Sequence, residues 1–324
     1  MPPNQSPRVP GDDRTRHRPA HRPYNRIMTG TQGVNHAQNL LGDFLRARRE
    51  LVSPESLGLP QIGLRRVRGL RREEVAMLAG ISADYYLRLE QGRDRSPSRQ
   101  VLESIARVLR LDEDATAYLL SLGLAQGAGR PRAQRRRPRK ESVPAGIRLL
   151  LDTIELPAFV EGRYLDVLAA NPYAAALSPR LVPGGNRLRD LFLDPAEQDL
   201  YPDWQEASAQ IVAGFRESVG TDVEDPRFIE LVGALSLASP RFRELWARHD
   251  VAHREGAMMR LDHPHVGELT LYREKLAITG TAGQMLVIYH PEPGTSNADK
   301  LALLASYALP TRNPGEQPTN SPRS

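Results

Sequence analysis

The stretch from Leu70 to Gly92 constrains the fold of this chain more than any other part of its sequence, and it runs LRREEVAMLAGISADYYLRLEQG. Apolar residues recur at helical spacing before Gly80 and predict a short helix with one buried face; they are Val75, Ala76 and Ala79. Gly80 lies where the chain must reverse, and glycine adopts a positive φ there without strain. Ser82 is a suitable N-cap for a second helix, whose inward residues are Ile81, Tyr86 and Leu89. Two short helices joined by a tight glycine turn form a helix-turn-helix.

The exposed edge of the second predicted helix has the chemistry needed to contact duplex DNA. Such a helix fits the major groove, and residues near its N-terminus reach base edges. Arg88 can donate to guanine O6 and N7, Asp84 can accept from a cytosine amino group, and Ala83 can contact a thymine methyl group. We expect base contacts from Ala83, Asp84, Tyr85, Leu87 and Arg88. We expect phosphate contacts from Arg71, Arg72 and Ser82. The alternative is an ordinary helical hairpin with a charged surface, but the glycine, the cap and the buried pattern in one register argue against it.

Charge is distributed unevenly along the chain. Residues 1–142 contain 27 Lys and Arg against 15 Asp and Glu, whereas residues 143–324 contain 17 against 24. A basic half is expected of the part that meets a polyanion. The chain has no cysteine, which excludes disulfides, thiol catalysis and cysteine-ligated zinc. No apolar run approaches the roughly 18 residues that a membrane span needs, and the N-terminus has no secretory signal. We therefore expect a cytoplasmic protein without membrane contact.

Composition divides the chain into five segments. Residues 1–35 predict a disordered arm, with Met28 as a candidate start, because Arg and Pro dominate and little can be buried. Residues 36–125 predict the helix-turn-helix domain. Residues 126–144 hold Gly, Pro and a run of Arg, which predicts a linker. Residues 145–310 predict a second globular domain, and residues 311–324 predict a disordered tail.

The second domain has a strand-strand, helices, three-strand order. We expect strands at Pro157–Glu161, Tyr164–Ala169, Glu268–Tyr272, Leu276–Gly280 and Gln284–His290. Between them, prolines after capping residues begin helices at Asn171-Pro172, Asp194-Pro195, Asp225-Pro226 and Ser239-Pro240, and a long helix spans Asp203–Val219. The predicted fold class is therefore two domains: an all-α helix-turn-helix bundle, then an α+β, PAS-like domain with an antiparallel sheet and helices on one face.

Most of the large aromatic residues of this second domain are expected between its sheet and its helices. They are Phe159, Phe192, Trp204, Phe215, Phe228, Phe242 and Trp246. Such a layer either closes into a solid core or encloses a cavity for a small apolar ligand. The residues alone leave both alternatives open.

Four histidines suggest an enzyme, although weakly: His249, His253, His263 and His265. The first two are spaced to share a helical face, and Asp250 or Asp262 could complete a metal site. The pattern is not His-Glu-x-x-His, however, and no Gly-x-Ser-x-Gly is present. We expect no catalytic residues, no metal, no cofactor and no enzymatic activity.

The N-terminal motif resembles the lambda-repressor-like, Xre-type helix-turn-helix family over about residues 40–122. The resemblance implies further helices at Leu40–Leu51, Arg99–Leu109 and Asp112–Leu122. It also implies an ion pair between a helix-one arginine, Arg48 or Arg49, and Glu90. The connection Ser53–Gly69 is longer than many members of the family have. Its run Arg65-Arg66-Val67-Arg68-Gly69 either binds phosphates or a minor groove, or is a solvated loop.

Five motifs of the second domain resemble the MmyB-like ligand-binding domain over nearly all of residues 145–305. They are NPYAAAL at 171–177, LYPDW at 200–204, LVGALS at 231–236, FRELWARHDV at 242–251 and HPHVGEL at 263–269. The resemblance implies a PAS-like fold and a fatty-acid-like or other apolar ligand. The predicted function is a sequence-specific, DNA-binding transcription regulator, expected as a homodimer, that such a ligand modulates. The alternatives are a dimerisation or partner-docking domain without a ligand and, less favoured, a metal-dependent enzyme.

Overall fold

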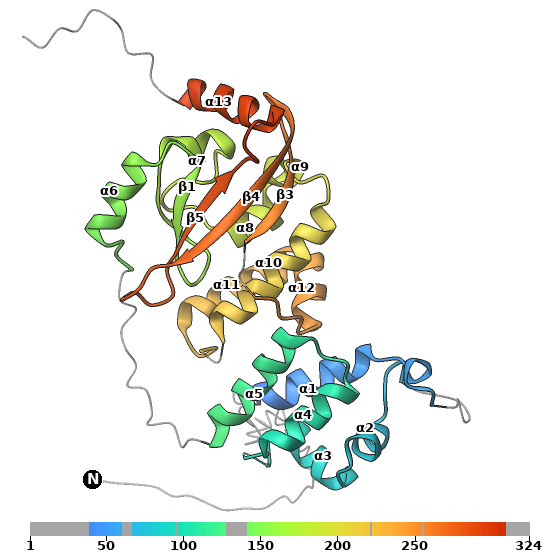
Figure 1. The fold of residues 1–324 in the computed structure, drawn as a ribbon. Coiled ribbons are helices and arrows are strands. Elements are labelled where there is room, and N and C mark those ends of the chain that lie inside the picture. Colours follow the sequence, from blue (N-terminus) through green and yellow to red (C-terminus); the bar gives the residue numbers. More distant parts are fainter. Residues whose placement is uncertain are drawn as a thin grey trace, which may run out of the picture. The chain divides into compact units, whose positions relative to one another are not determined.

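The computed structural model describes residues 39–59, 67–94, 96–127, 141–220, 222–253 and 256–308. These residues form an N-terminal helical region followed by an α+β region (Figure 1). The predicted fold class, an all-α bundle followed by an α+β domain with an antiparallel sheet, is therefore confirmed, although helices pack on both faces of the sheet and not on one. The expected arm 1–35, the expected tail 311–324 and residues 128–140 of the expected linker lie outside the described residues.

Among the described residues, five α-helices make up the N-terminal region: α1 (Leu40–Leu51), α2 (Arg72–Ala79), α3 (Ala83–Glu90), α4 (Arg99–Val108) and α5 (Glu113–Gly127). A short 3-10 helix, η2 (Pro54–Leu57), follows α1. The first helix has the predicted bounds, and α5 continues beyond its expected end at Leu122. Residues from all five α-helices are buried together in one core, among them Phe44, Val75, Tyr86, Leu102 and Leu119.

The sheet of the second region has five antiparallel strands: β1 (Ala158–Glu161), β2 (Val167–Ala170), β3 (Ala257–His263), β4 (Gly267–Ala277) and β5 (Met285–His290). Their order across the sheet is β2-β1-β5-β4-β3. The observed strands differ from the predicted strands in two respects. The strand β3 was not expected, and β4 runs unbroken from Gly267 to Ala277, so Leu276–Gly280 is not a strand of its own.

In the part of the second region that the structure describes, eight helices accompany the sheet: α6 (Ala145–Thr153), α7 (Pro172–Leu177), α8 (Arg187–Leu193), α9 (Pro195–Asp199), α10 (Trp204–Val219), α11 (Pro226–Ala238), α12 (Pro240–Ala247) and α13 (Ser296–Ala308). The four predicted capping residues all accept a backbone hydrogen bond at a helix start; they are Asn171, Asp194, Asp225 and Ser239. The helices α6, α8 and α13 were not part of the prediction.

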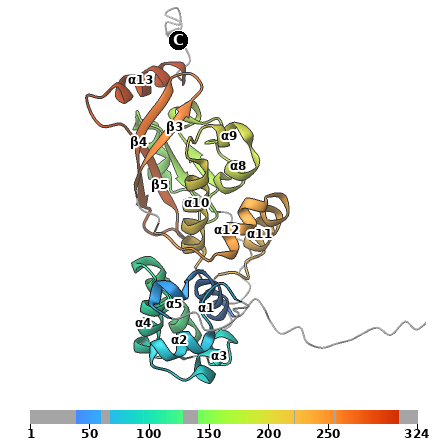
Figure 2. The ribbon, with the colours of Figure 1, turned by 90° about the vertical axis from the view of Figure 1, so that its right-hand side faces the viewer.

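The pleat of the sheet separates two apolar layers. Phe159 and Val287 are paired across β1 and β5, and they pack in one layer with residues of α7 and α13. Val160 and Leu286 are also paired, and they pack in the other layer with Leu151 of α6. Figure 2 shows α8, α9 and α10 together on one side of the strands. Among the described helices, none is long and apolar enough to cross a membrane.

Candidate functional site

The turn between α2 and α3 has the geometry that its residues predict. Gly80 adopts a φ of 71°, and its N–H donates to the carbonyls that end α2. Ser82 then caps α3, because its Oγ accepts from the backbone N–H of Tyr85 at 3.1 Å. Positive φ is costly for residues with a Cβ, so Gly80 is the residue that permits this sharp reversal.

The predicted DNA contacts lie on the outer side of α3. Tyr86 and Leu89 are completely buried on its inner side. Ser82, Ala83 and Asp84 are exposed, and the half-buried residues are Tyr85, Leu87 and Arg88. On α2 and its cap, Arg72 is half-buried and Arg71 is exposed. The exposed start of α3 is therefore free of packing against the helical core.

Arg88 and Asp84 form an ion pair one turn apart on α3. Both side chains are solvent-accessible, with 43% and 73% of their surface exposed. The Arg88 guanidinium also lies 5.6 Å from the centre of the Tyr85 ring. These contacts are those of a surface pair, which contributes little to stability. Arg88 can therefore exchange Asp84 for a base edge at small cost.

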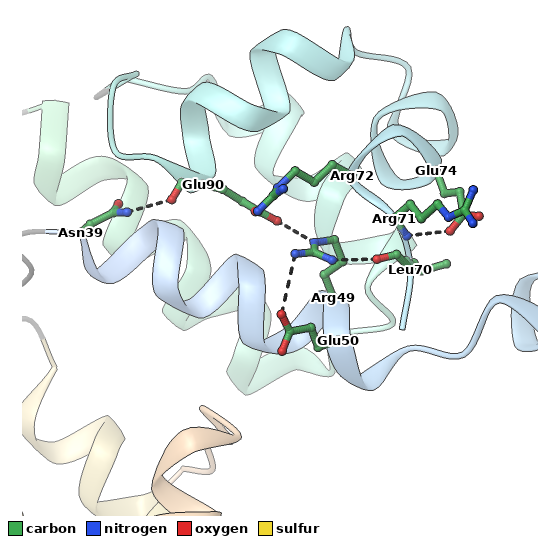
Figure 3. A network of polar contacts seen from close by, with 8 residues as sticks. All are labelled: Asn39, Arg49, Glu50, Leu70, Arg71, Arg72, Glu74 and Glu90. Carbon is green, nitrogen blue, oxygen red and sulfur yellow. Dashed lines mark hydrogen bonds and ion pairs between the residues drawn. The ribbon is translucent and has the colours of Figure 1, made fainter. Parts of the chain in front are cut away.

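A buried carboxylate ties α3 to α1 and α2 (Figure 3). Glu90 is fully buried, and its two oxygens accept from Arg49 Nε and Arg72 Nε, each at 2.6 Å. Of the two predicted candidates, Arg49 makes the bond. Arg49 also donates to the Leu70 carbonyl at 2.8 Å. Asn39, which caps α1, donates to the Glu90 carbonyl at 2.8 Å.

This network places a partly exposed guanidinium at the start of α2. Two guanidiniums share the Glu90 carboxylate, and the Arg72 side chain remains 42% exposed. The backbone N–H of Arg71 donates to Glu74 Oε2 at 2.6 Å, which holds the first turn of the helix. Burial works against the charged form of Arg49, yet its hydrogen bond to Glu90 raises its pKa above the ordinary value.

The basic loop between α1 and α2 is described in part. Residues 60–66, with Arg65 and Arg66, lie outside the described residues. Val67 and Arg68 are exposed, and the Leu70 N–H donates to the Arg49 carbonyl. Both interpretations of this loop, phosphate contact and solvated loop, therefore stay predictions.

A cavity of about 340 Å³ lies in the second region between the sheet and α10. Apolar side chains from three elements and from the Leu165 turn form much of its wall; they are Leu165, Leu191, Ile211, Phe215, Ala257 and Met259. Polar side chains on the wall are Arg187, Tyr201, Gln210, His253, Arg273 and Lys275. Such a mixture of apolar lining and a few polar groups is typical of small-ligand sites.

The seven aromatic residues predicted to bind the ligand mostly pack against one another. Phe242 stacks on Trp246 with ring centres 5.9 Å apart, and Phe192 lies edge-on to Phe242 at 5.3 Å. Trp204, Phe228 and Phe215 join the same cluster. Phe159 lies in the separate layer under the sheet. Of the seven, Phe215 lines the cavity, and the other six are not among the lining residues.

Two cations on the cavity wall bond to a second buried carboxylate. Glu161 is fully buried, and it accepts from Arg187 Nη1 at 2.7 Å and from Lys275 Nζ at 3.2 Å. The Arg187 guanidinium also lies 5.4 Å from the centre of the Phe159 ring. Burial opposes its charge, but the neighbouring phenols and Glu161 raise the pKa of Arg187 above its ordinary value. Burial also raises the pKa of Tyr201. The cavity wall therefore combines a cluster of charged groups with apolar side chains.

Comparison with known families settles what kind of protein has this arrangement. Residues 143–304, half of the chain, match the MmyB-like transcription regulator ligand binding domain. The chain belongs to the MmyB-like family of transcription regulators. Residues 40–119 of this regulator match a helix-turn-helix domain. A search of the curated proteins found no match.

The two matches make this MmyB-like regulator a DNA-binding protein with a ligand-binding domain, and not a member of an enzyme family. The alternative of a metal-dependent enzyme rested on four histidines, and two of these have other contacts in the structure. His249 lies beside Arg216, with Nδ1 at 3.2 Å from a guanidinium nitrogen, and His263 contacts the Ala176 carbonyl. Within the described ranges, no group of three or more His, Cys, Asp or Glu is placed to hold a metal ion.

The charged wall of the regulator's cavity was missed from the sequence. Glu161 and Lys275 lie on strands far apart in the chain, and Arg187 begins a helix that was not predicted. Each lies in or beside an apolar run, where a charged residue is unusual unless it is paired. A charged residue in or beside an apolar run was therefore the sequence signal that could have indicated these buried ion pairs.

Proposed function

We propose that this MmyB-like regulator binds specific DNA sequences through α3 and that a small, fatty-acid-like molecule in the C-terminal cavity modulates that binding. The proposal includes a homodimer acting in the cytoplasm. The observation that carries it is the exposed start of α3, with Ser82, Ala83 and Asp84 outward and Tyr86 and Leu89 buried beneath them.

The chemistry of α3 supports sequence-specific contact. Ala83, Asp84, Tyr85, Leu87 and Arg88 present an apolar group, a carboxylate, a phenol and a guanidinium on one accessible surface. Base edges in the major groove are distinguished by such donors, acceptors and methyl contacts. Arg71, Arg72 and Ser82 lie at the two helix starts, where backbone amides and positive charge favour phosphates.

Modulation by the ligand needs a difference in affinity between two states of the protein, because occupancy alone shifts no equilibrium. Dimerisation follows from the same logic of DNA recognition, since two copies of one short helix contact two half-sites and multiply specificity. The apolar body of the cavity and its volume of about 340 Å³ support a small amphiphilic or apolar ligand.

Selection of genomic fragments by the purified full chain tests the proposal. The expected result is an enriched, two-fold-symmetric sequence motif. Its enrichment should change when a saturated fatty acid is added. Recovery of fragments without a shared motif would overturn sequence specificity. A motif whose enrichment does not change when the fatty acid is added would overturn modulation by that class of ligand.

A second candidate function is a dimerisation or partner-docking domain without a ligand. The observation in its favour is the closed aromatic cluster around Phe242 and Trp246, which leaves most of the predicted ligand-binding residues packed against each other. Mass spectrometry of denatured, extracted protein separates the two functions, because a bound amphiphile at a stoichiometric level contradicts this candidate.

A further inference from the structure

The helix α11 has an apolar face that is exposed among the described residues. Its inner side packs against α8 and α12 and buries Phe228, Leu231 and Leu235 (Figure 2). On its outer side, Ile229 and Leu237 have 57% and 87% of their surface exposed. Leu237 is the most exposed large apolar residue in the described part of the chain. Contiguous apolar surface of this kind marks an interaction site in soluble proteins.

Gly233 lies at the centre of this face. It is four residues from Ile229 and four from Leu237, so the three residues follow one stripe of the helix, and Ala234 beside them is also exposed. The packing of one chain does not require this glycine, because a Cβ at Gly233 would meet nothing within 4 Å beyond its own helix backbone and its chain neighbours. Glycine inside a helix costs about 0.5–1 kcal/mol relative to alanine, and its use is to let another backbone approach closely.

The stripe is complementary to a second copy of itself. A two-fold axis beside Gly233, perpendicular to the helix, pairs residues that are equally far from Gly233 in opposite directions. Ile229 of each copy then meets Leu237 of the other, with the two glycines between these contacts. Two-fold dimers are built in this way, since one patch serves both subunits.

The two ends of the face have opposite charges. Near the first turn of α11, Glu230 is exposed, and its neighbour Arg227 is paired with Asp166. Near the last turn, Arg243 of α12 donates from Nη1 to the Ser236 carbonyl at 2.9 Å. Arg243 is exposed as well, and neither it nor Glu230 forms an ion pair within the described residues. The face therefore has a free carboxylate at one end and a free guanidinium at the other.

These charges match when two copies of α11 pack antiparallel. Glu230 and Ser236 are each three residues from Gly233, so the axis sets Glu230 of one copy opposite the Ser236 carbonyl of the other, where Arg243 is bound. A parallel pair would bring like charges together at both ends, which disfavours it. We infer that two copies of this chain associate through α11, antiparallel about Gly233, with Glu230 and Arg243 in contact across the interface. The inference rests on the proposed homodimer and adds its surface and register.

Cross-linking through one introduced cysteine tests the axis, because the chain has no cysteine of its own. Gly233→Cys places a thiol where the same residue of both copies meets. Mild oxidation of the full chain should yield a covalent dimer, since a disulfide needs Cα atoms about 4.4–6.8 Å apart. Gly146→Cys is the matched control, because Gly146 is an exposed glycine on α6 whose Cβ would also meet nothing within 4 Å. It should stay uncross-linked.

Charge reversal tests the register, with sedimentation equilibrium of the full chain as the measurement. Glu230→Arg and Arg243→Glu should each raise the dissociation constant of the dimer about tenfold or more, because each turns two attractive contacts into two repulsive ones. The double variant should return to within about threefold of the parent, a recovery that loss of folding does not produce. Asp152→Arg makes the same change of charge at an exposed position of α6 and should leave the dimer unchanged.

The outcomes separate this inference from the proposed homodimer. A dimeric parent in which Gly233→Cys does not cross-link, or in which the charge variants behave as Asp152→Arg does, overturns the inference and leaves the homodimer in place. A parent that stays monomeric both free and on its selected DNA overturns the two together. A monomer in which the Gly233→Cys thiol resists alkylation also overturns the inference, and it would assign the face to another segment of the same chain.

Discussion

Arg49 on α1 donates from Nε to the buried Glu90 carboxylate at the end of α3, at 2.6 Å. The bond fixes α3, the helix that we propose contacts DNA, against the first helix of the bundle. Arg49 also donates to the Leu70 carbonyl just before α2, so one guanidinium links α1 to α3 and to the segment that leads into α2. The geometry of the exposed surface of α3 therefore depends on a contact on its hidden side.

Removing Arg49 should destabilise the helix-turn-helix domain. Arg49→Ala leaves Glu90 fully buried with Arg72 as its remaining cation, and loss of one partner from a buried pair costs about 3 kcal/mol. Urea unfolding measures the change. Arg99→Ala is the control, because its pair with Glu103 is exposed and should contribute less than about 1 kcal/mol. Equal losses for the two variants would show that burial of Glu90 has no energetic consequence.

Arg88 should determine preference at one base pair in each half-site. Arg88→Ala should reduce discrimination there by roughly 1–3 kcal/mol, because a bidentate contact to guanine is lost. Asp84→Asn is a useful comparison with Arg88→Ala, because it removes the ion pair between the two residues and leaves the Arg88 guanidinium in place. Selection from a randomised site library measures both. An unchanged motif for Arg88→Ala would remove this residue from the base contacts.

Phosphate contacts at the start of α2 should appear in the salt dependence of binding. Arg71→Ala and Arg72→Ala should each weaken binding to all sequences and lower the slope of log K against log salt by about 0.9 per lost contact. Arg72→Ala should also lower stability, because Arg72 bonds to the buried Glu90, whereas Arg71 is exposed. Slopes equal to that of the parent would argue against a phosphate role for either residue.

The helix-turn-helix was predictable because its determinants are local. Gly80 and Ser82 act within a few residues of their own positions, as a turn and a cap. The likeness to known families supplied the outer helices of the bundle. The strand β3 was missed because Met258 and Met259 make both of its faces look apolar at its start, which obscures the alternation.

The cavity was not predictable from composition, although its domain was. The aromatic residues were assigned to the ligand because large apolar side chains line most binding sites, but in this fold they stack on each other. The charged cluster on the cavity wall depends on pairing between β1, α8 and β4, and side chains from these elements meet only after the sheet has formed. Sequence patterns report local periodicity and contain little information on such distant pairs.

His263 should make the C-terminal domain sensitive to acid. The backbone N–H of His265 donates to its Nδ1 at 3.2 Å, so the ring is neutral and Nε2 donates to the Ala176 carbonyl at 3.1 Å. Burial lowers the pKa of His263. The hydrogen bond to the Ala176 carbonyl raises this pKa, and the neighbouring His265 lowers it, so that the net shift is downward. As pH falls below about 6.5, the unfolded chain takes up a proton at this position that the folded chain resists, so stability falls.

His263→Gln tests this linkage. Glutamine retains a donor for Ala176 and does not titrate, so the free energy of unfolding should fall less steeply than in the parent between about pH 7 and pH 5. The difference in slope should not exceed about 1.4 kcal/mol per pH unit, the limit for one proton. Parallel curves would show that His263 is protonated as readily in the folded chain as in the unfolded one.

Two substitutions separate ligand binding from packing in the C-terminal domain. Ala207 lines the cavity, whereas Trp246 packs in the aromatic cluster. Ala207→Leu extends an apolar side chain into the cavity and should weaken binding of a saturated fatty acid by about tenfold or more, with stability within about 1 kcal/mol of the parent. Trp246→Leu leaves a void and should cost about 2–4 kcal/mol with affinity retained. Calorimetry and urea unfolding measure the two effects. If Ala207→Leu leaves fatty-acid binding and the DNA response unchanged, the cavity is not the ligand site, and the closed cluster then favours a domain that docks a partner.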